Sequence, residues 1–427
     1  YRKFLLSSTI QRILYAGFVF VDAYVETLIV HLKKQIANDK HELEWIKNAN
    51  DFNDFYHQKI LQKSVSNNYL SRFYPPNALN NKIMNQLNSE LGKLYNNFPK
   101  KLLGRSNKKE AEKLLKYLKR LKTGDITLLG LVTSGDQGLV TGNNSKYLAK
   151  IVKTKEEVIL QKNKLIEEIN KYYDLHKTTK KEILDMKEDQ LFELAEDIKQ
   201  KKKNPSIFGR FFIYKTVLEN DIKDYNTLTK DEKEEGIKSN SFTWVSYFNG
   251  NPNGNRWIVP FDFCIDWSTD AVKELKEGIL TNSRWQGQNY FDSTGVAWVD
   301  YFTTKIKGFI VSQGPYSKST VKLHSVSQLS DEFVLAIINS NFISYYVKNF
   351  ITSTHTLQIN DGRLIPIIIP SKKQESQITE LVDQILTKKK ANPEADITAE
   401  EQEIDKLVYK LYGLTEEEIK IVEGNGE

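Results

Sequence analysis

The sequence predicts an α+β fold, in which a mixed, β-rich domain carries a helical N-terminal spacer, a helical insertion and C-terminal helices. Three observations lead to this prediction. Residues 207–320 alternate short apolar runs with turn signals rich in Gly, Asn and Pro, a pattern typical of strands. Residues from about 154 to 203 form a long charged stretch of helical composition, and residues 334–347 place apolar side chains at helical spacing. With 427 residues, the chain is long enough for two or three domains.

Composition indicates a globular protein without a membrane segment. Hydrophobic residues make up 40% of the chain and charged residues 27%, which is adequate for building cores. No apolar run approaches the roughly 20 residues needed to span a bilayer. The single cysteine, Cys264, excludes an intrachain disulfide framework and a Cys-based zinc site, and it suits the reducing cytoplasm, where we place the protein. The net charge of +6 favours a polyanionic partner.

The N-terminal quarter predicts two regions. Within residues 1–33 we expect the end of a helix at 2–6 and two strands at 10–15 and 25–30. Two strands cannot bury themselves, so we expect this segment to be the severed remnant of a larger sheet. Residues 34–125 predict a mainly helical spacer. Its last helix, at 108–121, has leucines on one face and lysines on the other, and the lysines either contact DNA phosphates or, as we favour, face solvent.

The rest of the chain predicts strands first and helices last. Residues 126–150 indicate strands around a glycine loop, and residues 357–370 indicate a hairpin that turns at Gly362, fixed by local hydrogen bonds of Asn360 and Arg363. The C-terminal segment, 371–427, predicts helices. Gln374 opens the first of them, a capping box at 398–401 begins the second, Gly413 ends it, and a Thr at 415 caps the last.

The sequence contains no recognisable catalytic motif. Enzymes that methylate amino groups of bases hold the flipped base with an [Asn/Asp/Ser]-Pro-Pro-aromatic tetrapeptide. The nearest segments, Asn204-Pro-Ser-Ile207 and Tyr74-Pro-Pro-Asn77, lack its residues or their order. A glycine loop for S-adenosylmethionine followed by an acidic ribose ligand is also missing, as is a nuclease site of the PD-(D/E)xK type. We therefore assign no catalytic residue, no metal site and no cofactor to this chain.

Several segments together resemble one protein family. Gly138-Leu-Val-Thr-Gly-Asn-Asn-Ser-Lys-Tyr-Leu148, Gly254-Asn-Arg-Trp257, Ile265-Asp-Trp267 and Gly295-Val-Ala-Trp298 follow the order found in target recognition domains, and residues 20–27 resemble the end of an adenine-N6 methyltransferase domain. The helix at 334–347 and the Pro-punctuated strand after it fit the same pattern. The chain thus resembles the C-terminal, TaqI-like target recognition region of a type IIG restriction–modification DNA methyltransferase. The helical insertion is not part of the shared pattern.

This resemblance implies a domain organisation and a set of partners. Residues 1–33 would be a remnant of the catalytic domain, 34–125 a spacer, 126–370 the target recognition domain with its insertion at about 154–203, and 371–427 a C-terminal helical segment. The family implies that the intact phage-defence enzyme uses S-adenosylmethionine to methylate adenine in double-stranded DNA. The catalytic domain belongs to the same polypeptide, and we expect this chain alone to be inactive. An alternative is a protein-interaction or scaffold fragment of a phage-defence complex.

The candidate DNA-binding residues lie in polar turns. Amide side chains can pair with adenine, Arg with guanine, and Lys with phosphate. For each turn the competing interpretation is an ordinary solvated loop, and Trp267 and Trp298 are expected in the core because they lie in apolar strand patterns. The predicted DNA-binding set is Asn143, Asn144, Lys146, Arg256, Trp257, Arg284, Gln286, Gln288, Asn289, Lys318 and Lys322.

Overall fold

The computed structural model has the α+β architecture that the sequence predicts. It describes residues 7–18, 26–48, 55–63, 90–105, 107–203, 215–238, 242–251, 254–279, 282–302, 305–352 and 355–424. The chain divides into two compact units. Unit 1 comprises Tyr1–Ser134, Asp300–Gly308 and His324–Glu427, and unit 2 comprises Gly135–Val299 and Phe309–Leu323.

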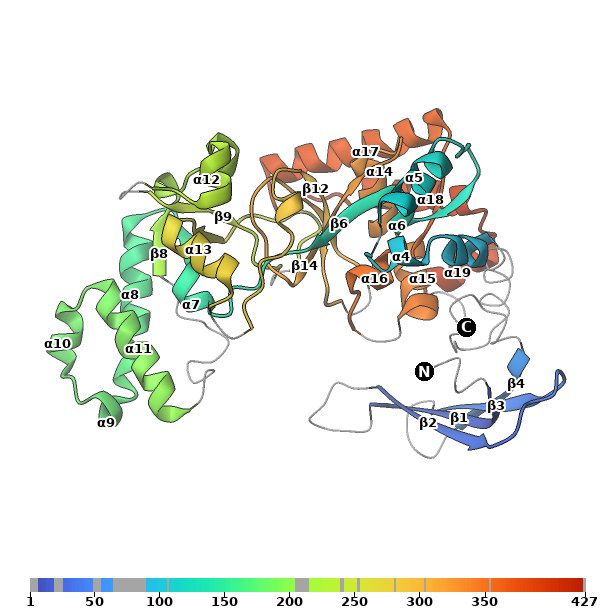
Figure 1. Cartoon of the computed structure of the whole chain (residues 1–427), viewed down its shortest axis with the longest axis horizontal. Coiled ribbons are helices and arrows are strands. Elements are labelled where there is room, and N and C mark those ends of the chain that lie inside the picture. The colour runs from blue at the N-terminus through green and yellow to red at the C-terminus, as the bar shows by residue number, and fades with distance from the viewer. Residues whose placement is uncertain are drawn as a thin grey trace. The chain divides into compact units, whose positions relative to one another are not determined.

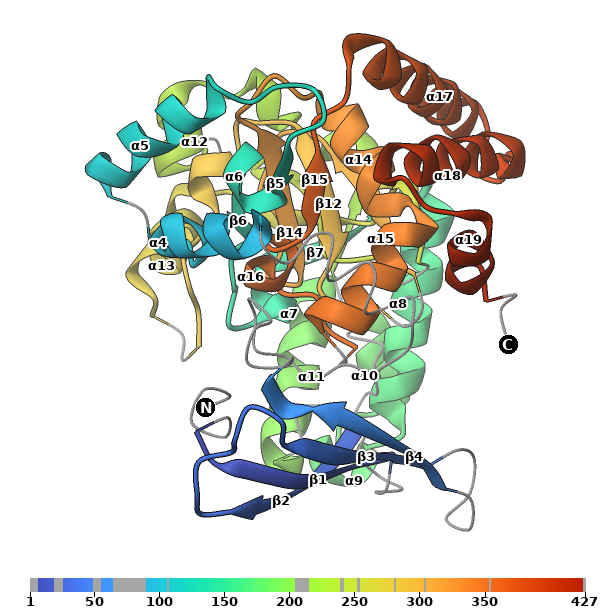
Figure 2. The same cartoon turned by 90° about the vertical axis from the view of Figure 1, so that its right-hand side faces the viewer.

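A four-stranded sheet begins unit 1, formed by β1 (Thr9–Phe18), β2 (Glu26–Lys33), β3 (Glu42–Asn48) and β4 (Phe55–Leu61) in the order β2-β1-β3-β4 (Figure 2). Its core contains Ile13, Leu43 and Trp45. The strands expected at 10–15 and 25–30 are confirmed where described, whereas the helix end at 2–6 lies outside the described residues. The expectation of a helical spacer is wrong for β3 and β4, because β3 pairs in parallel with β1 and β4 pairs antiparallel with β3, which extends the first two strands into a four-stranded sheet.

Beyond this sheet, the described part of unit 1 is mainly helical. Near the spacer's end lie α4 (Pro99–Leu102) and α5 (Lys108–Leu118), followed by β5 (Ile126–Leu128) and α6 (Leu129–Val132). Of the leucine face predicted for α5, Leu114 is buried but Leu115 is exposed. The C-terminal part contains α14 (Asp331–Asn339), α15 (Asn341–Tyr346), the π-helix η4 (Val347–Ile351), α16 (Ile359–Gly362), β15 (Pro366–Ile368), α17 (Lys372–Ala391), α18 (Thr398–Tyr412) and α19 (Glu416–Val422).

The helix predicted at 334–347 is present, but Ser340 divides it. Ser340 ends α14 and accepts a hydrogen bond from the backbone N–H of Ile343 at 3.2 Å, which caps α15. All residues of α14 from Phe333 to Asn339 are buried. The chain therefore turns by capping and keeps both short helices in the core.

Two local predictions in the C-terminal part are wrong. The expected hairpin at 357–370 is the short helix α16 followed by β15, because β15 pairs antiparallel with the distant β5. The Arg363 side chain does hydrogen-bond to Asn360 (2.8 Å), as predicted. Helix α18 has Ile397 as its N-cap, without a capping box, since Asp396 rather than Thr398 accepts the local hydrogen bonds. The left-handed Gly413 stop and the Thr415 cap are confirmed.

Unit 2 is built on strands and an inserted group of helices. One sheet has the order β8-β7-β11-β9, from β7 (Leu148–Val152), β8 (Lys215–Leu218), β9 (Trp244–Tyr247) and β11 (Phe263–Asp266). A second sheet has the order β10-β13-β12-β14-β6, from β6 (Thr133–Gln137), β10 (Trp257–Ile258), β12 (Gly295–Val299), β13 (Gly308–Val311) and β14 (Thr320–Ser325). The short helices α7 (Asn144–Tyr147), α12 (Lys230–Glu235), α13 (Thr269–Glu277) and the 3-10 helix η3 (Gln288–Tyr290) lie in the connections between these strands.

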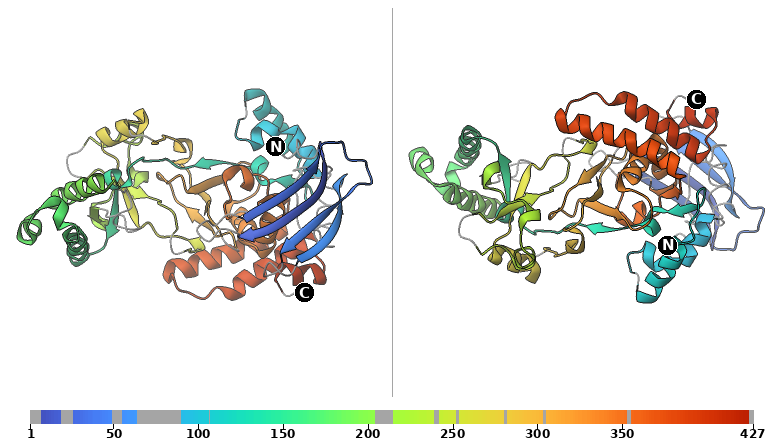
Figure 3. Two further views of the ribbon diagram at one scale, coloured as in Figure 1. Left: turned by 90° about the horizontal axis from the view of Figure 1, so that it is seen from below. Right: turned by 90° about the horizontal axis from the view of Figure 1, so that it is seen from above.

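The predicted helical insertion is confirmed between β7 and β8. It contains α8 (Lys155–Asn170), α9 (Tyr173–His176), α10 (Lys180–Asp185) and α11 (Glu188–Lys202), coloured green in Figures 1 and 3. Residues Leu165, Ile183 and Ile198 belong to a core of its own. Because β7 and β8 pair in parallel, a crossover connection is required, and the insertion provides it.

An aromatic core fills unit 2. Trp267, Phe291 and Tyr225 pack edge to face, with ring centroids 6.0 to 6.5 Å apart. Trp267 and Trp298 are both buried, which confirms the prediction that these two tryptophans are structural. Within the described part of the chain, no helix has the length and apolarity needed to cross a membrane.

Candidate nucleic-acid interface

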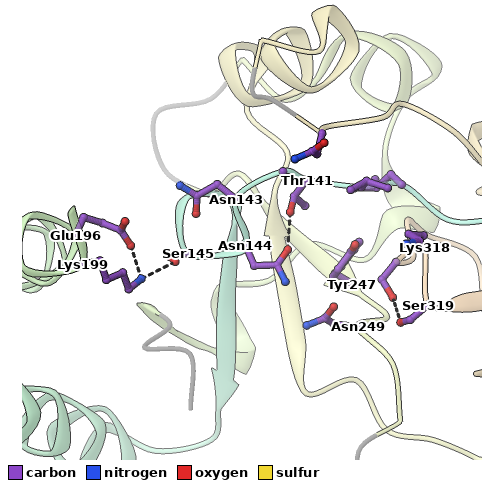
Figure 4. Close-up of a pocket in the computed structure, with 15 residues that line it drawn as sticks. Thr141, Asn143, Asn144, Ser145, Glu196, Lys199, Tyr247, Asn249, Lys318 and Ser319 are labelled. Atoms are coloured by element: carbon purple, nitrogen blue, oxygen red, sulfur yellow. Dashed lines mark hydrogen bonds and ion pairs between the residues drawn. The ribbon is translucent and has the colours of Figure 1, made fainter. Parts of the chain in front are cut away.

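An open cleft of about 730 Å³ lies within unit 2, and we refer to it as the cleft. Five segments form it: the loop and short helix before β7, α11 of the insertion, the end of β9, the loop after α13 that contains Asn282, and the loop before β14. Figure 4 shows the side chains of these segments that line the cleft. The cleft is lined by Leu139, Val140, Thr141, Gly142, Asn143, Asn144, Ser145, Glu196, Lys199, Tyr247, Asn249, Asn282, Ser317, Lys318 and Ser319.

The first wall is the glycine turn that the sequence singled out. Gly142 has a φ of +74°, in the left-handed region that favours glycine, and it lies in the glycine loop that the sequence predicts. Asn143 caps α7 by accepting a hydrogen bond from the backbone N–H of Lys146 at 3.2 Å. Thr141 Oγ1 donates to Asn144 Oδ1 at 2.5 Å, which fixes the orientation of that carboxamide. The Asn144 Nδ2 group has no hydrogen-bond acceptor among the described residues, so it remains available to a ligand.

The loop before β14 forms the second wall and is held by close backbone contact. The backbone N–H of Leu139 donates to the Tyr316 carbonyl at 2.8 Å, and that of Lys318 donates to the Leu139 carbonyl at 3.0 Å. A Cβ on Gly138 would stand 1.9 Å from the Tyr316 oxygen, so only glycine permits this approach. The Lys318 side chain is exposed and forms no ion pair within the described ranges. A single positive charge is thereby presented on a fixed backbone.

Two further carboxamides, Asn249 and Asn282, complete the polar lining. Neither side chain has a hydrogen-bond partner in the part of the chain that the structure describes. Asn282 has a φ of +73°, a conformation that Asn tolerates better than most residues. Together with Asn143 and Asn144, they give the cleft four carboxamides, each of which combines a donor with an acceptor. The predicted DNA-binding set does not include Asn249 and Asn282, although Asn249 opens the turn-rich segment 249–254 and Asn282 opens the same polar loop as Arg284 and Gln286.

The insertion contributes charge to the cleft through α11. Lys199 Nζ lies 2.5 Å from Glu196 Oε1 and 3.3 Å from Ser145 Oγ, as Figure 4 shows. No sequence pattern distinguishes Glu196 and Lys199, because α11 contains many charged side chains at similar spacing. Only the folded chain distinguishes the pair that reaches the cleft.

The other predicted DNA-binding residues lie outside the cleft. Lys146 is exposed but forms an ion pair with Glu274 at 2.6 Å, and its hydrogen bond to that carboxylate raises the Lys146 pKa. Arg284 pairs through its backbone with Val140, and Gln286 Nε2 donates to the Gly138 carbonyl at 2.8 Å, so this segment stabilises the glycine loop. Gln288 and Asn289 are exposed on η3. Whether these residues contact DNA remains a prediction.

Two members of the predicted set are buried, which corrects the expectation that they contact DNA. Trp257 is only 1% exposed, in β10, with the Arg256 guanidinium 5.8 Å from its ring centroid. Lys322 is also 1% exposed, in β14, and its Nζ donates to the Ser312 carbonyl at 3.0 Å. Burial lowers the Lys322 pKa to about 7, since a charged ammonium loses its hydration in the core. Neither side chain can reach a ligand at the surface.

The side chains of the cleft are mainly uncharged polar groups and lysines. Among its described lining residues the acidic side chain is Glu196, which is paired with Lys199, and no described group of three or more His, Cys, Asp or Glu side chains is arranged to hold a metal ion. Hydroxyls, carboxamides and two lysines are the groups that proteins use for phosphates, sugars and base edges.

No protein-family model matches this sequence, and no curated protein matches it either. Among solved structures, the chain is similar to the type IIL restriction-modification enzyme MmeI, described in complex with DNA. The TM-score is 0.40 at 10% identity, over 97% of this chain and 44% of MmeI. It is also similar to the type IIG restriction endonuclease BpuSI, with a TM-score of 0.27 at 10% identity, over 96% of this chain and 44% of BpuSI. The chain spans less than half the length of either neighbour, and likenesses of this size carry no functional conclusion.

Proposed function

We propose that this chain binds double-stranded DNA through the cleft of unit 2. The observation that carries the proposal is the grouping of four carboxamides with Lys318 and Lys199 in one cleft. Lysines bind phosphates without regard to sequence, whereas an Asn side chain can pair with adenine through two hydrogen bonds. Lysines and carboxamides in one cleft could therefore provide both affinity for the DNA backbone and discrimination between base sequences.

The sequence resemblance supports a more specific role. The segment that resembles the opening of a target recognition domain, residues 138–148, forms one wall of the cleft. We therefore propose that this chain is the sequence-reading part of an adenine-N6 DNA methyltransferase in a restriction–modification enzyme. In this proposal another part of the polypeptide binds S-adenosylmethionine and transfers the methyl group, because this chain contains no Asn-Pro-Pro-aromatic segment.

The test measures binding of labelled duplex DNA of random sequence over a range of salt concentrations. We expect the affinity to fall steeply as salt rises, because each phosphate contact releases counterions. Lys318→Gln should weaken binding by about tenfold near 0.1 M salt and reduce the salt slope by about 0.9. Lys181→Gln, on α10 and away from the cleft lining, is the control with the same loss of charge.

Sequence discrimination requires a second measurement. Selection from a random duplex library should enrich a short motif with the wild-type chain, and the enrichment should relax at one position with Asn249→Ala. A folded chain that fails to bind duplex DNA, or that binds it without dependence on salt, would rule out the proposed function.

A scaffold role is the second candidate, and exposed apolar side chains on the insertion favour it. Ile159, Leu160, Tyr173 and Leu184 are all about half exposed or more. A protein partner that covers them would give a role independent of DNA. Charge reversal at Arg284 and Lys318 separates the two candidates. A DNA-binding protein should lose affinity for DNA, whereas a scaffold should still bind its protein partner.

A further inference from the structure

Helix α11 of the insertion is hydrogen-bonded to the rest of unit 2 near both of its ends. Near its start, Glu188 Oε1 accepts hydrogen bonds from Thr216 N at 3.0 Å and from Thr216 Oγ1 at 3.2 Å in β8. Near its end, Lys199 Nζ donates to Ser145 Oγ in α7 at 3.3 Å. Between these points, buried side chains such as Ile198 hold α11 in the core of the insertion. The helix is thus a fixed wall of the cleft.

The ammonium group of Lys199 lines the cleft and is held in place by its contacts with Glu196 and Ser145. Its side chain is only 13% exposed, and its Nζ lies 2.5 Å from Glu196 Oε1, one helical turn earlier. Glu196 is more exposed, at 38%, and also lines the cleft. An incoming phosphate would be attracted by the ammonium and repelled by the carboxylate. The two charges therefore oppose each other in any contact with an anion.

We propose that Lys199 binds a DNA phosphate in the cleft and that Glu196 is the internal competitor that this phosphate displaces. The inference rests on the proposed function, and it makes the insertion part of the DNA-binding site. Figure 4 shows Lys199 and Lys318 at opposite ends of the group of labelled side chains, with Asn144 and Asn249 between them. A single DNA strand that crosses the cleft would meet a lysine at each end and carboxamides in the middle.

The two residues should have opposite effects on affinity. Lys199→Gln removes one phosphate contact, so it should weaken binding about tenfold near 0.1 M salt and reduce the salt slope by about 0.9. Glu196→Gln removes the competitor while keeping a polar side chain. It should strengthen binding by about twofold to fivefold, in line with the modest strength of partly exposed ion pairs.

The same helix supplies matched controls. Lys201 and Asp197 form an ion pair at 2.6 Å on α11, and neither residue lines the cleft. Lys201→Gln and Asp197→Asn make the same charge changes on the same element. We expect both controls to leave the affinity and the salt slope within about twofold of the wild type, since exposed charges away from the ligand contribute little at this ionic strength.

The experiment measures binding of the whole chain and its four variants to a labelled random duplex from low to moderate salt. A Lys199→Gln slope equal to that of Lys201→Gln would overturn the proposal, and so would weaker binding by Glu196→Gln. Lys199→Arg, which retains the charge, should restore the slope. If Lys199→Gln unfolds, Glu196→Gln alone tests the proposal: stronger DNA binding supports it, and weaker binding overturns it.

The outcomes also separate this inference from the proposed function. Absence of DNA binding by a folded wild-type chain defeats the proposed function. Binding that Lys318→Gln weakens but Lys199→Gln does not would leave the proposed function in place and remove the insertion from the site.

Discussion

Two polar regions of the molecule use the same residue types in opposite ways. In unit 1, the side chain of Asn339 is buried and forms two hydrogen bonds with the backbone of Gly308. Gly308 N donates to Asn339 Oδ1 at 2.7 Å, and Asn339 Nδ2 donates to the Gly308 carbonyl at 3.0 Å. In the cleft of unit 2, Asn249 has no partner among the described residues. Asn339 therefore stabilises the fold, whereas Asn249 is kept available for a ligand.

Lysines show the same contrast over four residues of sequence. Lys318 lies in the loop before β14 and is exposed at the cleft, whereas Lys322 lies within β14 and is buried. Burial of an ammonium destabilises the folded state unless the proton leaves, and that is the physical origin of the lowered Lys322 pKa. In a turn-rich sequence, therefore, the burial of a polar residue decides its role more than its residue type does.

The largest expected effect is the loss of stability when the buried amide side chain of Asn339 is removed. Asn339→Ala leaves both backbone groups of Gly308 unpaired in the core, so the free energy of unfolding should fall by about 2–4 kcal/mol. Asn249→Ala should change it by less than about 0.5 kcal/mol. Urea unfolding followed by tryptophan fluorescence measures both. Equal destabilisation by the two variants would remove the distinction between the regions.

The next effect concerns Lys322 and pH. The folded pKa is about 7, against an ordinary value of 10.5, so between these values the unfolded chain binds a proton that the folded chain does not. Stability should therefore rise with pH, by about 1.4 kcal/mol per unit, or roughly 2–3 kcal/mol between pH 7 and 9. Below pH 7 this contribution becomes constant. Lys322→Met should abolish the rise, and a slope unchanged by that substitution would contradict the burial of a neutral amine.

A smaller effect is expected when a cleft amide is removed. Asn282→Ala should reduce the preference of the chain for its selected DNA motif by about 1–2 kcal/mol at one base position, with little change in binding to random duplex. Competition between the selected motif and single-base variants provides the measurement. A uniform loss of affinity for all sequences would assign Asn282 to phosphate contact.

The smallest effect should come from Lys146. Glu274 already neutralises this lysine in an exposed ion pair, so Lys146→Gln should change DNA affinity by no more than about twofold. The comparison with Lys318→Gln, measured on the same duplex at the same salt, sharpens the contrast between paired and unpaired lysines. A tenfold loss with Lys146→Gln would show that the Glu274 pair opens when DNA binds.

Much of the local structure followed from the sequence alone. Helical spacing, caps and turn residues are short-range properties, so the α14–α15 region, the helical insertion, the Gly413 stop and the left-handed Gly142 were all predictable. The apolar strand pattern around Trp267 and Trp298 likewise predicted their burial. Strand pairing between distant segments was not predictable from local patterns. The sequence indicates a hairpin at 357–370, but β15 pairs with β5, which lies more than 230 residues away in the chain.

The sequence by itself determined an α+β chain with a helical insertion and turns rich in amide and lysine side chains. Only the tertiary structure decided which of those side chains reach a common cleft. The reason is that burial depends on where a strand begins and on what packs over it, and these are long-range facts: four positions separate exposed Lys318 from buried Lys322, and 54 positions separate Lys199 from Ser145, its partner across the cleft.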